Sequence, residues 1–573
     1  MPGFKKQDMV NWFSPKSLVK IALETVLSAV FGRYADRREI QAALTEDAQV
    51  FSYAEKEEIW FDYVADLGDG FNPTYTVATA LAHNELTVEG KPLQRGRFLV
   101  MGGDQVYPSA STELYNNRLR GPYKHALPRS EKQSEDDPHL YALPGNHDWY
   151  DGLTAFLRQF VQGRYIGGWR TQQQRSYFAI ELPHNWWLLA IDIQLGADLD
   201  WPQKDYFRQA MKKLSADNKV IIASAEPVWI EEGLTGEKVA SSLHYIEAQV
   251  KKTGAEVAIN LAGDLHHYAH YESTSRHLVT CGGGGAFAHG THHLSDNLTL
   301  EEKPDANSTQ QQTAYSLNDR CFPSKSDSIK TLCGNLLFFM KNKAMAATIG
   351  FLYTLLILTY QQQSLGLFTD FFSQIGNEIV FADFLSVDLF QNMPGLLLML
   401  LFVVSMMAFY DGFPGRSETT ARLQRIFIGG GHGFLHILLA LYLAFLIFPL
   451  IYQSTLISGF IAISVYWFVA SVSAGLLFGL YLLFSNLLFK AHGDAAMSSN
   501  SIEDYKSFLR FHLNADGELT VYAIGFKKII RNWFLNENEL YRSSANINDH
   551  AHIIDRFSIA PPSNSSLEKI QNK

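Results

Sequence analysis

The chain has 573 residues, of which 47% are hydrophobic, and its 48 Lys and Arg against 58 Asp and Glu give a formal net charge of −10. This charge, without a dense basic stripe, argues against a general nucleic-acid binder, because such proteins present a basic face to the phosphates. The three cysteines form no CxxC pair, which excludes a disulfide framework or a zinc knuckle and indicates a reducing compartment.

Residues 1–58 are expected to form an N-terminal helical segment. Basic residues near the start are not followed by an uninterrupted apolar region, so a signal peptide is not expected. Residues 18–31 repeat their apolar side chains at helical spacing. Such a helix packs on a domain or lies at a membrane interface, and the sequence leaves both alternatives open.

Residues 59–300 have the pattern of an α/β domain. Short apolar runs each end in polar residues and glycine, which is typical of buried strands that lead into functional loops. Ligands usually gather at the carboxyl ends of such strands. The runs are WFDYVADLGD, GRFLVMGGDQVYP, YALPGNHDWYDG, NWWLLAIDIQ, KVIIASAEP, EVAINLAGDLHHY and HLVTCGGGG.

Residues 301–343 are predicted to be a polar linker, and residues 344–490 an all-α transmembrane domain. Four apolar runs, 344–360, 393–409, 426–452 and 456–489, approach or exceed the roughly 17 to 25 residues that cross a bilayer. The last run could be one tilted helix or a broken one, so we expect four or five spans. No Asp, Glu, Lys or Arg lies inside the runs, which favours an anchor over a transporter.

The basic flanks of the spans predict the orientation of this multi-pass membrane protein. Lys341, Lys343, Arg416, Arg422 and Arg425 are expected on the cytoplasmic side, and the acidic segment 361–392 outside. The catalytic domain and the tail, residues 491–573, are then cytoplasmic. The tail alternates apolar and polar residues around an Asp-Gly pair at 516–517, which predicts a β-hairpin. Because an isolated hairpin is marginally stable, we expect it to pack on the catalytic domain.

Five strand ends carry residue types that bind metals. Each is weak alone, but their order along the chain is informative. They are Asp66, Asp104 with Tyr107, Asn146 with His147 and Asp148, Glu226, and Asp264 with His266.

In this order, and above all in LPGNHDWYDG, the chain resembles the calcineurin-like metallophosphoesterase superfamily over about residues 61–293. Gly68 and the GDxxY at 103–107 are most similar to its purple acid phosphatase-like branch. The resemblance implies a four-layer α/β/β/α sandwich, joined here to the helical membrane domain. It also implies two divalent or mixed-valence metal ions, Mn or Fe, with Mg and Zn as alternatives.

The resemblance implies that Asp104 bridges the two metals, that Asp66, Tyr107 and His266 complete the first site, and that Asn146 belongs to the second. Two departures affect the second site, because Glu226 and Asp264 stand where the family has histidines. Either they replace those ligands, which gives an all-oxygen site that favours Mg²⁺, Mn²⁺ or Ca²⁺ over zinc, or the second site is weakened or lost.

His147 and Asp148 are expected to be catalytic without binding metal. The resemblance implies that His147 assists the leaving oxygen while Asp148 orients it, since an imidazole held by a carboxylate suits general acid work. His289 follows the glycine run at 282–285 and is a candidate substrate contact, with an exposed connector as the alternative.

The function implied is metal-dependent hydrolysis of a phosphomonoester or phosphodiester at the membrane, with a hydroxide activated by the metal pair as the attacking group. The expected partners are the lipid bilayer and a phosphorylated substrate, a lipid-linked one included, and no nucleic acid. The alternative is a membrane scaffold or sensor whose degenerate phosphoesterase domain binds without turnover.

Overall fold

The computed structural model describes most of the chain. The described residues are 3–31, 49–130, 134, 136–193, 199–237, 239, 241–302, 311–361, 393–451 and 455–562. They fall into two compact units. An α/β unit comprises Met1–Val10, Lys20–Ser328 and Ser501–Lys573, and a helical unit comprises Asn11–Val19 and Ile329–Asn500. The α/β unit is therefore assembled from segments on both sides of the helical one in the sequence.

One sheet of the α/β unit has nine strands among the described residues, and its centre is parallel. In spatial order the strands are β1 (Val50–Ser52), β9 (Phe178–Glu181), β10 (Trp186–Ala190), β11 (Lys219–Ala223), β12 (Glu256–Ala262), β14 (His277–Cys281), β13 (Tyr268–Glu272), β16 (Gln311–Leu317) and β15 (Asn297–Glu302).

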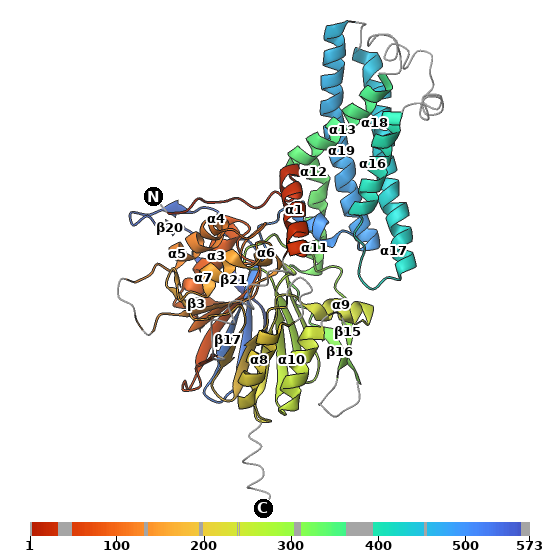
Figure 1. The fold of residues 1–573 in the computed structure, drawn as a ribbon. Helices are drawn as coiled ribbons and strands as arrows, with labels where there is room; N and C mark the ends of the chain where they lie inside the picture. Colours follow the sequence, from red (N-terminus) through yellow and green to blue (C-terminus); the bar gives the residue numbers. More distant parts are fainter. Residues whose placement is uncertain are drawn as a thin grey trace, which may run out of the picture. The chain divides into compact units, whose positions relative to one another are not determined.

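The other large sheet has eight strands in the described part of the chain, and the C-terminal segment supplies three of them. In spatial order the strands are β21 (Ala551–Ile559), β18 (Leu519–Phe526), β17 (Lys506–Leu513), β2 (Ile59–Val64), β5 (Phe98–Met101), β6 (His139–Ala142), β8 (Trp169–Thr171) and β7 (Tyr165–Ile166). The hairpin expected around residues 516–517 is present as β17 and β18, and β17 pairs with β2, so the tail is part of the sheet (Figure 1).

The alternation of side chains along each strand explains why the two large sheets stack on each other and are covered by helices. Phe98 and Val100 of β5 face a core shared by both large sheets, whereas Leu99 and Met101 face a second core. Successive side chains of a strand point to opposite faces, so each sheet buries both faces. The helices that cover the outer face of the eight-stranded sheet include α3 (Phe71–Ala82), α5 (Gly121–Ala126) and α7 (Thr154–Phe160).

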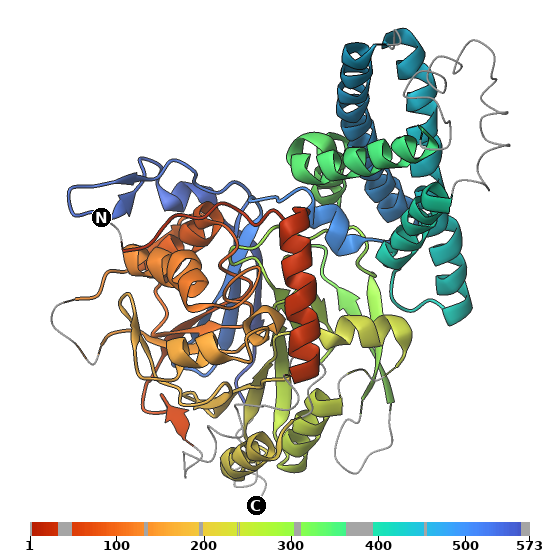
Figure 2. The ribbon, with the colours of Figure 1, turned by 45° about the horizontal axis from the view of Figure 1, so that its top comes forward.

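The nine-stranded sheet is covered on its outer face by α8 (Trp201–Ala210) and α10 (Ser241–Lys252), which lie side by side (Figures 1 and 2). Asp200 caps α8 by accepting a hydrogen bond from the amide of Gln203 at 2.7 Å, and Pro202 fits the first turn. The mixed α/β class expected for this part of the chain is confirmed, and all seven apolar runs contain a strand.

Shorter elements complete this unit. They are α4 (Thr112–Leu114), η1 (Tyr115–Arg120), α6 (Asn146–Trp149), η2 (Met211–Lys213), α9 (Val228–Thr235), α21 (Ile547–His550) and the two small hairpins β3 (Glu85–Val88) with β4 (Lys91–Gln94) and β19 (Phe534–Leu535) with β20 (Tyr541–Arg542).

Two expected boundaries are corrected. The α/β unit extends beyond residues 59–300, because β1, β16 and the C-terminal strands belong to its sheets. The segment 301–343 is not only a linker, since it contains β16, α11 (Lys325–Leu332), η3 (Cys333–Leu337) and α12 (Phe338–Lys341). β16 is largely polar, and its residues Gln311 to Ser316 pair with β15. Tyr315 is buried in an apolar cluster with Leu298, so ladder hydrogen bonds and apolar burial both fix the strand.

The helical unit contains the apolar runs as helices. They are α13 (Lys343–Gln361), α16 (Met393–Phe409), α17 (Glu418–Gln424) continuing through η4 (Arg425–Gly430) into α18 (Gly431–Ile451), and α19 (Leu456–Phe489), followed by α20 (Gly493–Ser498). In the described residues two stretches, Glu418–Ile451 and Leu456–Phe489, are long and apolar enough to cross a membrane. A third span results if Lys325–Lys341 and Lys343–Thr359, bent by 60°, count as one.

The expected number of four or five spans therefore stays a prediction. One reason is that α16, with 17 residues, is shorter than the 18 residues taken here as the least that cross a membrane. Most of the acidic segment, residues 362–392, lies outside the described residues. The N-terminal helix α1 (Pro15–Phe31) is present, and its residues Leu18, Val19 and Leu23 are exposed. Both alternatives for this helix stay predictions.

Glycines bring the helices of this unit close together. A Cβ at Gly429 would lie 2.8 Å from the carbonyl oxygen of Met406, and one at Gly433 would lie 2.7 Å from the Cα of Val403. Small residues at such crossings let backbones approach, which is how helices associate in lipid. On the same helix, two histidines lie among the apolar residues and hydrogen-bond each other, with 2.9 Å between the Nε2 atoms of His432 and His436.

Candidate functional site

The predicted ligand residues lie in loops that meet at the carboxyl ends of two groups of parallel strands. β2, β5 and β6 are parallel neighbours in one sheet, and β11, β12 and β14 in the other. The amide of Asp264, after β12, donates to Asp66 Oδ2, after β2, at 2.9 Å. The amide of Leu67 donates to the carbonyl of Asp104, after β5, at 2.8 Å. The loops of the two sheets thus form one site.

Four of the predicted residues form a buried cluster around the hydroxyl of Tyr107. This oxygen lies 2.9 Å from Asp66 Oδ1, 3.2 Å from Asp104 Oδ2 and 3.0 Å from His266 Nε2. His266 Nε2 is 3.7 Å from Asp66 Oδ1. None of the four side chains is more than 5% exposed. The structure therefore brings together the residues expected for the first metal.

The residues expected for the second metal border the same cluster. Asn146 begins α6 directly after Gly145, and a Cβ at Gly145 would lie 2.1 Å from Asp104 Oδ1. The Oδ1 atom of Asn146 is buried without a hydrogen-bond partner among the described residues. Burial, and then the charge of Asp104, raise the pKa of Glu226 to about 7. Glu226 is thus close enough to Asp104 to feel its charge, and Asn146 directly follows the glycine that packs on the Asp104 side chain.

Three aspartates of the site have left-handed backbone conformations. The φ angles are 59° at Asp66, 48° at Asp104 and 65° at Asp264. This region is unfavourable for residues with a Cβ, and each such residue costs about 1 to 3 kcal/mol. Such strain persists where the surrounding structure fixes it, and it is commonly found at functional sites. Here it places three carboxylates in neighbouring loops.

The electrostatics of the cluster favour cations. Burial and the charges of Asp104 and Asp264 raise the pKa of Asp66 well above its usual value. Burial also raises the pKa of Asp104. Buried carboxylates that repel one another must take up protons or be neutralised by bound cations. The mixture of carboxylate, amide and phenol oxygens with an imidazole nitrogen fits divalent metal ions.

The tautomer of His266 is set by its other ring nitrogen. Nδ1 lies 2.9 Å from the carbonyl oxygen of Phe287, which can only accept, so Nδ1 carries a proton. Burial and the neighbouring His289 hold the pKa of His266 well below its usual value, so the ring is neutral. Nε2, the atom next to Tyr107 and Asp66, is therefore the nitrogen with the lone pair, as metal ligation requires.

His147 and Asp148 differ from expectation in how they are held. The amide of His147 donates to Asp104 Oδ1 at 2.9 Å, and its Nδ1 lies 2.7 Å from the carbonyl oxygen of Pro108. Asp148 Oδ2 accepts from the amides of Gly145 at 2.9 Å and Gln105 at 3.3 Å, and Oδ1 accepts from the hydroxyl of Tyr115. The Pro108 carbonyl thus orients the imidazole, and Asp148 fixes the loop, because as the third residue of α6 it caps the helix start.

His289 lies beside His266, with 4.1 Å between the ring centroids. The glycine run before it has a packing reason. A Cβ at Gly282 would lie 2.4 Å from Asp66 Oδ2, and one at Gly284 would lie 2.4 Å from the carbonyl oxygen of Ala65. These glycines let the loop pack on the end of β2, so the expected close approach to a phosphate is not needed to explain them.

Sequence reasoning missed Lys506 on β17. Its side chain is fully buried, and its Nζ has no hydrogen-bond partner among the described residues. Burial, only partly opposed by the charge of Asp69, lowers the pKa of Lys506 to about 7. The next residue, Ser507, donates its amide to the carbonyl of Gly283 at 2.9 Å. No local signal links position 506 to loops more than 200 residues earlier, because this proximity is created by strand pairing.

Comparisons with known proteins do not indicate a function for this chain. No family model matches the chain, and no curated protein matches it. Among solved structures it is similar to one described as GAP50, the anchor in the inner membrane complex of Plasmodium, at 13% identity and a TM-score of 0.30. That similarity covers 46% of this chain and 78% of the other.

Proposed function

We propose that the chain hydrolyses phosphate esters at a membrane, with two metal ions held at the edge where the loops of both sheets meet. The observation that carries this proposal is the buried cluster of Tyr107, Asp66, Asp104 and His266, with hydroxyl distances of 2.9 to 3.2 Å. The order of helices, sheet, sheet and helices also supports it, because that is the layering of the metallophosphoesterase sandwich which the sequence resembles.

In this proposal Asp66, Asp104, Tyr107 and His266 would hold one ion, and Asp104 with Asn146, Glu226 and Asp264 would hold the other. The buried amide oxygen of Asn146 without a hydrogen-bond partner among the described residues supports the second site. So does the raised pKa of Glu226, because a carboxylate beside Asp104 is stabilised by a cation. Bound ions would activate water and neutralise charge that develops on the phosphate.

His147 is the proposed proton donor to the leaving oxygen. Because Nδ1 already carries the proton shared with the Pro108 carbonyl, His147 gains and loses its second proton at Nε2. Asp148 is a positioning residue, since its oxygens are bonded to the loop amides and to Tyr115. His289, beside His266, is the proposed substrate contact.

The substrate class is a phosphomonoester or phosphodiester that is presented at the bilayer, a lipid-linked one included. The two helices long and apolar enough to span a membrane support this location. A hydrophobic anchor confines the enzyme to the surface, and so raises the encounter rate with substrates in the same bilayer.

The test is hydrolysis by the full chain in detergent, stripped of metal and then supplied with Mn²⁺, Mg²⁺, Fe²⁺ or Zn²⁺. We expect Mn²⁺ to restore turnover of a phosphomonoester or a phosphodiester. Asp104→Asn should lower kcat/KM at least about a hundredfold, the usual size of a lost transition-state interaction. Glu226→Ala and Asp264→Ala should each reduce the number of Mn²⁺ ions bound per chain.

A matched control is Asp192→Asn, which neutralises another buried aspartate after a strand of the same unit. Asp192 follows β10 and bonds Ser176 at 2.5 Å and Trp149 at 3.2 Å, outside the proposed ligand set. It should change kcat/KM less than tenfold. Absence of turnover with every metal and both substrate classes would reject hydrolysis and favour the scaffold or sensor.

A further inference from the structure

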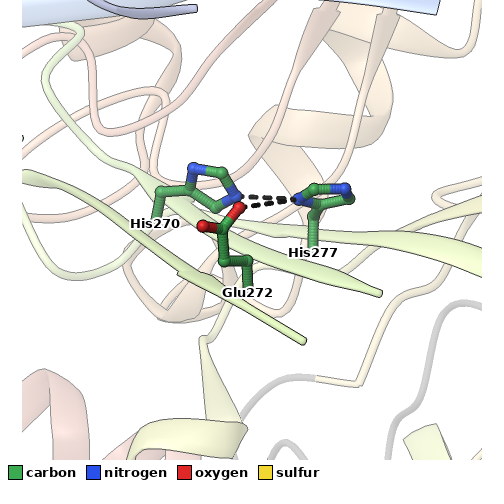
Figure 3. Close-up of side chains that lie close together, drawn as sticks. All are labelled: His270, Glu272 and His277. Atoms are coloured by element: carbon green, nitrogen blue, oxygen red, sulfur yellow. Dashed lines mark hydrogen bonds and ion pairs between the residues drawn. The ribbon is translucent and has the colours of Figure 1, made fainter. Parts of the chain in front are cut away.

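A second group of metal-ligand side chains lies at the turn end of the hairpin formed by β13 and β14. His270 and Glu272 are on β13, and Glu272 pairs with His277 of β14. His270 Nε2 lies 2.9 Å from His277 Nδ1, and Glu272 Oε2 lies 4.0 Å from the same nitrogen (Figure 3). One ligand atom from each of the three lies within 4.8 Å of the others. None of them has a role in the proposed hydrolysis.

His270 is held as metal-binding histidines usually are. Its Nδ1 lies 2.9 Å from Asp555 Oδ2, which also accepts from the hydroxyl of Tyr268 at 2.8 Å. Because Asp555 Oδ2 accepts the hydroxyl proton of Tyr268, it is also the acceptor toward the ring, and His270 Nδ1 donates. A carboxylate on the far nitrogen fixes the ring and raises its basicity as a ligand. The Nε2 lone pair therefore points at His277.

Phe557 fixes both imidazole rings. Its ring centroid is 4.3 Å from that of His270 and 4.7 Å from that of His277, and both pairs are stacked. Side-chain positions that are set before an ion binds reduce the entropy lost on binding. Glu272 is the ligand whose side chain can move toward an ion, because half of it is exposed to solvent.

The distance between the two nitrogens suits a metal ion. Two imidazole nitrogens at about 2.05 Å from a tetrahedral ion are about 3.3 Å apart, so the observed 2.9 Å needs only a small adjustment. In the absence of an ion the two nitrogens form a hydrogen bond, with one proton between the rings. An ion can replace this proton if the proton moves from Nδ1 to Nε2 of His277, which changes the tautomer of the ring and not its charge.

His270 Nε2 and His277 Nδ1 face each other at 2.9 Å, so with the proton of His277 on its Nε2 both nitrogens offer a lone pair to one ion. Neutral imidazole is the form that binds metal. We infer that His270, Glu272 and His277 form a binding site for a divalent transition-metal ion of the Zn²⁺ class, with water at the fourth position. Two imidazoles and one carboxylate are a typical ligand set for such ions.

This site is separate from the proposed dinuclear centre. The centre lies beyond the other end of the hairpin, where Tyr268 pairs with Cys281. Tyr268 and Glu272 are four positions apart on the strand, which is roughly 13 Å. The inference therefore holds or fails independently of the proposed hydrolysis.

The experiment counts Zn²⁺ ions bound to the metal-depleted full chain in detergent, by calorimetric titration and elemental analysis. His277→Ala should bind one ion fewer per chain than the wild type and keep its hydrolytic activity. Glu272→Gln changes a half-exposed position and should not endanger folding. It should lower the affinity for this one Zn²⁺ ion at least tenfold. Asp555→Asn should weaken it by about tenfold to a hundredfold, the usual effect of losing such a partner.

His512→Ala is the matched control, because His512 is also partly exposed, lies 3.4 Å from Glu58 and stacks on an aromatic ring, that of Trp60. It should bind as many ions as the wild type. Equal ion counts in the wild type and in folded His277→Ala and Glu272→Gln would overturn the inference, as would an equal loss in His512→Ala. If the dinuclear centre is absent, the wild type should bind one Zn²⁺ and His277→Ala none.

Discussion

Arg510 and Asp62 form a buried ion pair between the C-terminal strand β17 and the first strand of the site, β2. Arg510 Nε lies 2.7 Å from Asp62 Oδ1, and Nη2 lies 3.0 Å from Oδ2. Arg510 also donates to the carbonyl of Leu93 at 3.1 Å. Both side chains are almost fully buried. Removing one partner of such a pair is costly, because the other charge remains in the interior without compensation.

Asp62→Ala should therefore lower the free energy of unfolding of the α/β unit by about 3 to 5 kcal/mol. Urea denaturation in detergent would measure this change. Asp205→Ala, which removes the exposed ion pair with Arg208, should cost less than about 1 kcal/mol. If both variants lost a similar free energy of unfolding, burial would not be the reason why the ion pair of Arg510 and Asp62 stabilises the unit.

His244 is a second charged residue whose environment decides its protonation. Its Nε2 lies 2.8 Å from Glu232 Oε1, and its Nδ1 lies 3.4 Å from Glu247 Oε2. Burial alone would lower the pKa of His244, but the hydrogen bonds to the two glutamates outweigh it and raise the pKa to about 9. The folded state therefore holds a proton that the unfolded state releases near pH 6.5.

The stabilisation from His244 is fully present below pH 6.5 and is lost as the pH rises through about 9, because there the folded state binds more protons than the unfolded state. The wild type should lose up to roughly 3 kcal/mol more stability across this window than His244→Gln does. Unfolding at pH 6, 7, 8 and 9 measures the difference. Parallel pH profiles of the two proteins would contradict the raised pKa.

At the scale of elements, the loop after β14 depends on its glycines. A Cβ at Gly283 would lie 2.2 Å from the Oγ and 2.4 Å from the amide nitrogen of Ser507 on β17. The neighbour is partly backbone, so it cannot move aside by a change of rotamer. The loop that carries His289 is thus packed against a strand contributed by the C-terminal segment.

Gly283→Ala should lower the stability of the α/β unit by about 1 to 3 kcal/mol, the usual range for overpacking. The thermal unfolding midpoint of the detergent-solubilised protein would report the loss. Gly3→Ala is the control, since a Cβ there meets no atom within 4 Å. An unchanged midpoint for Gly283→Ala would show that β17 and the loop separate easily.

At the scale of the whole molecule, an α/β unit and a helical unit share one chain, and the flanking charges predict their orientation. Lys341 precedes the helix α13 and Lys343 is its first residue, and Arg416, Arg422 and Arg425 lie between α16 and α18. By the positive-inside rule both groups are predicted to be cytoplasmic. The α/β unit precedes α13 and also follows α19, so an even number of crossings returns the chain to the side on which it began.

The protein should stay in the membrane fraction after extraction with alkaline carbonate. Protease added to inside-out vesicles should digest the α/β unit, and protease added to right-side-out vesicles should leave it intact. A tag on the C-terminus and an antibody against the α/β unit would follow the fragments. Digestion from the opposite side would reverse the orientation, and release by carbonate would reject membrane spanning.

The sequence by itself determined the features that depend on local pattern. Apolar runs predicted the strands at the centre of both sheets, and the residues after them predicted the cluster around Tyr107, because the ends of neighbouring parallel strands meet at one edge. Hydropathy likewise predicted the apolar helices, since a span needs only a continuous apolar segment.

Only the tertiary structure decided the pairings between distant segments. Arg510 meets Asp62 across 448 positions, and Asp555 meets His270 across 285. Local periodicity carries no information on which distant strands will pair, so neither the buried ion pair nor the carboxylate that holds His270 Nδ1 could be predicted. The same holds for the Pro108 carbonyl that orients His147, because a backbone group has no signature in the sequence.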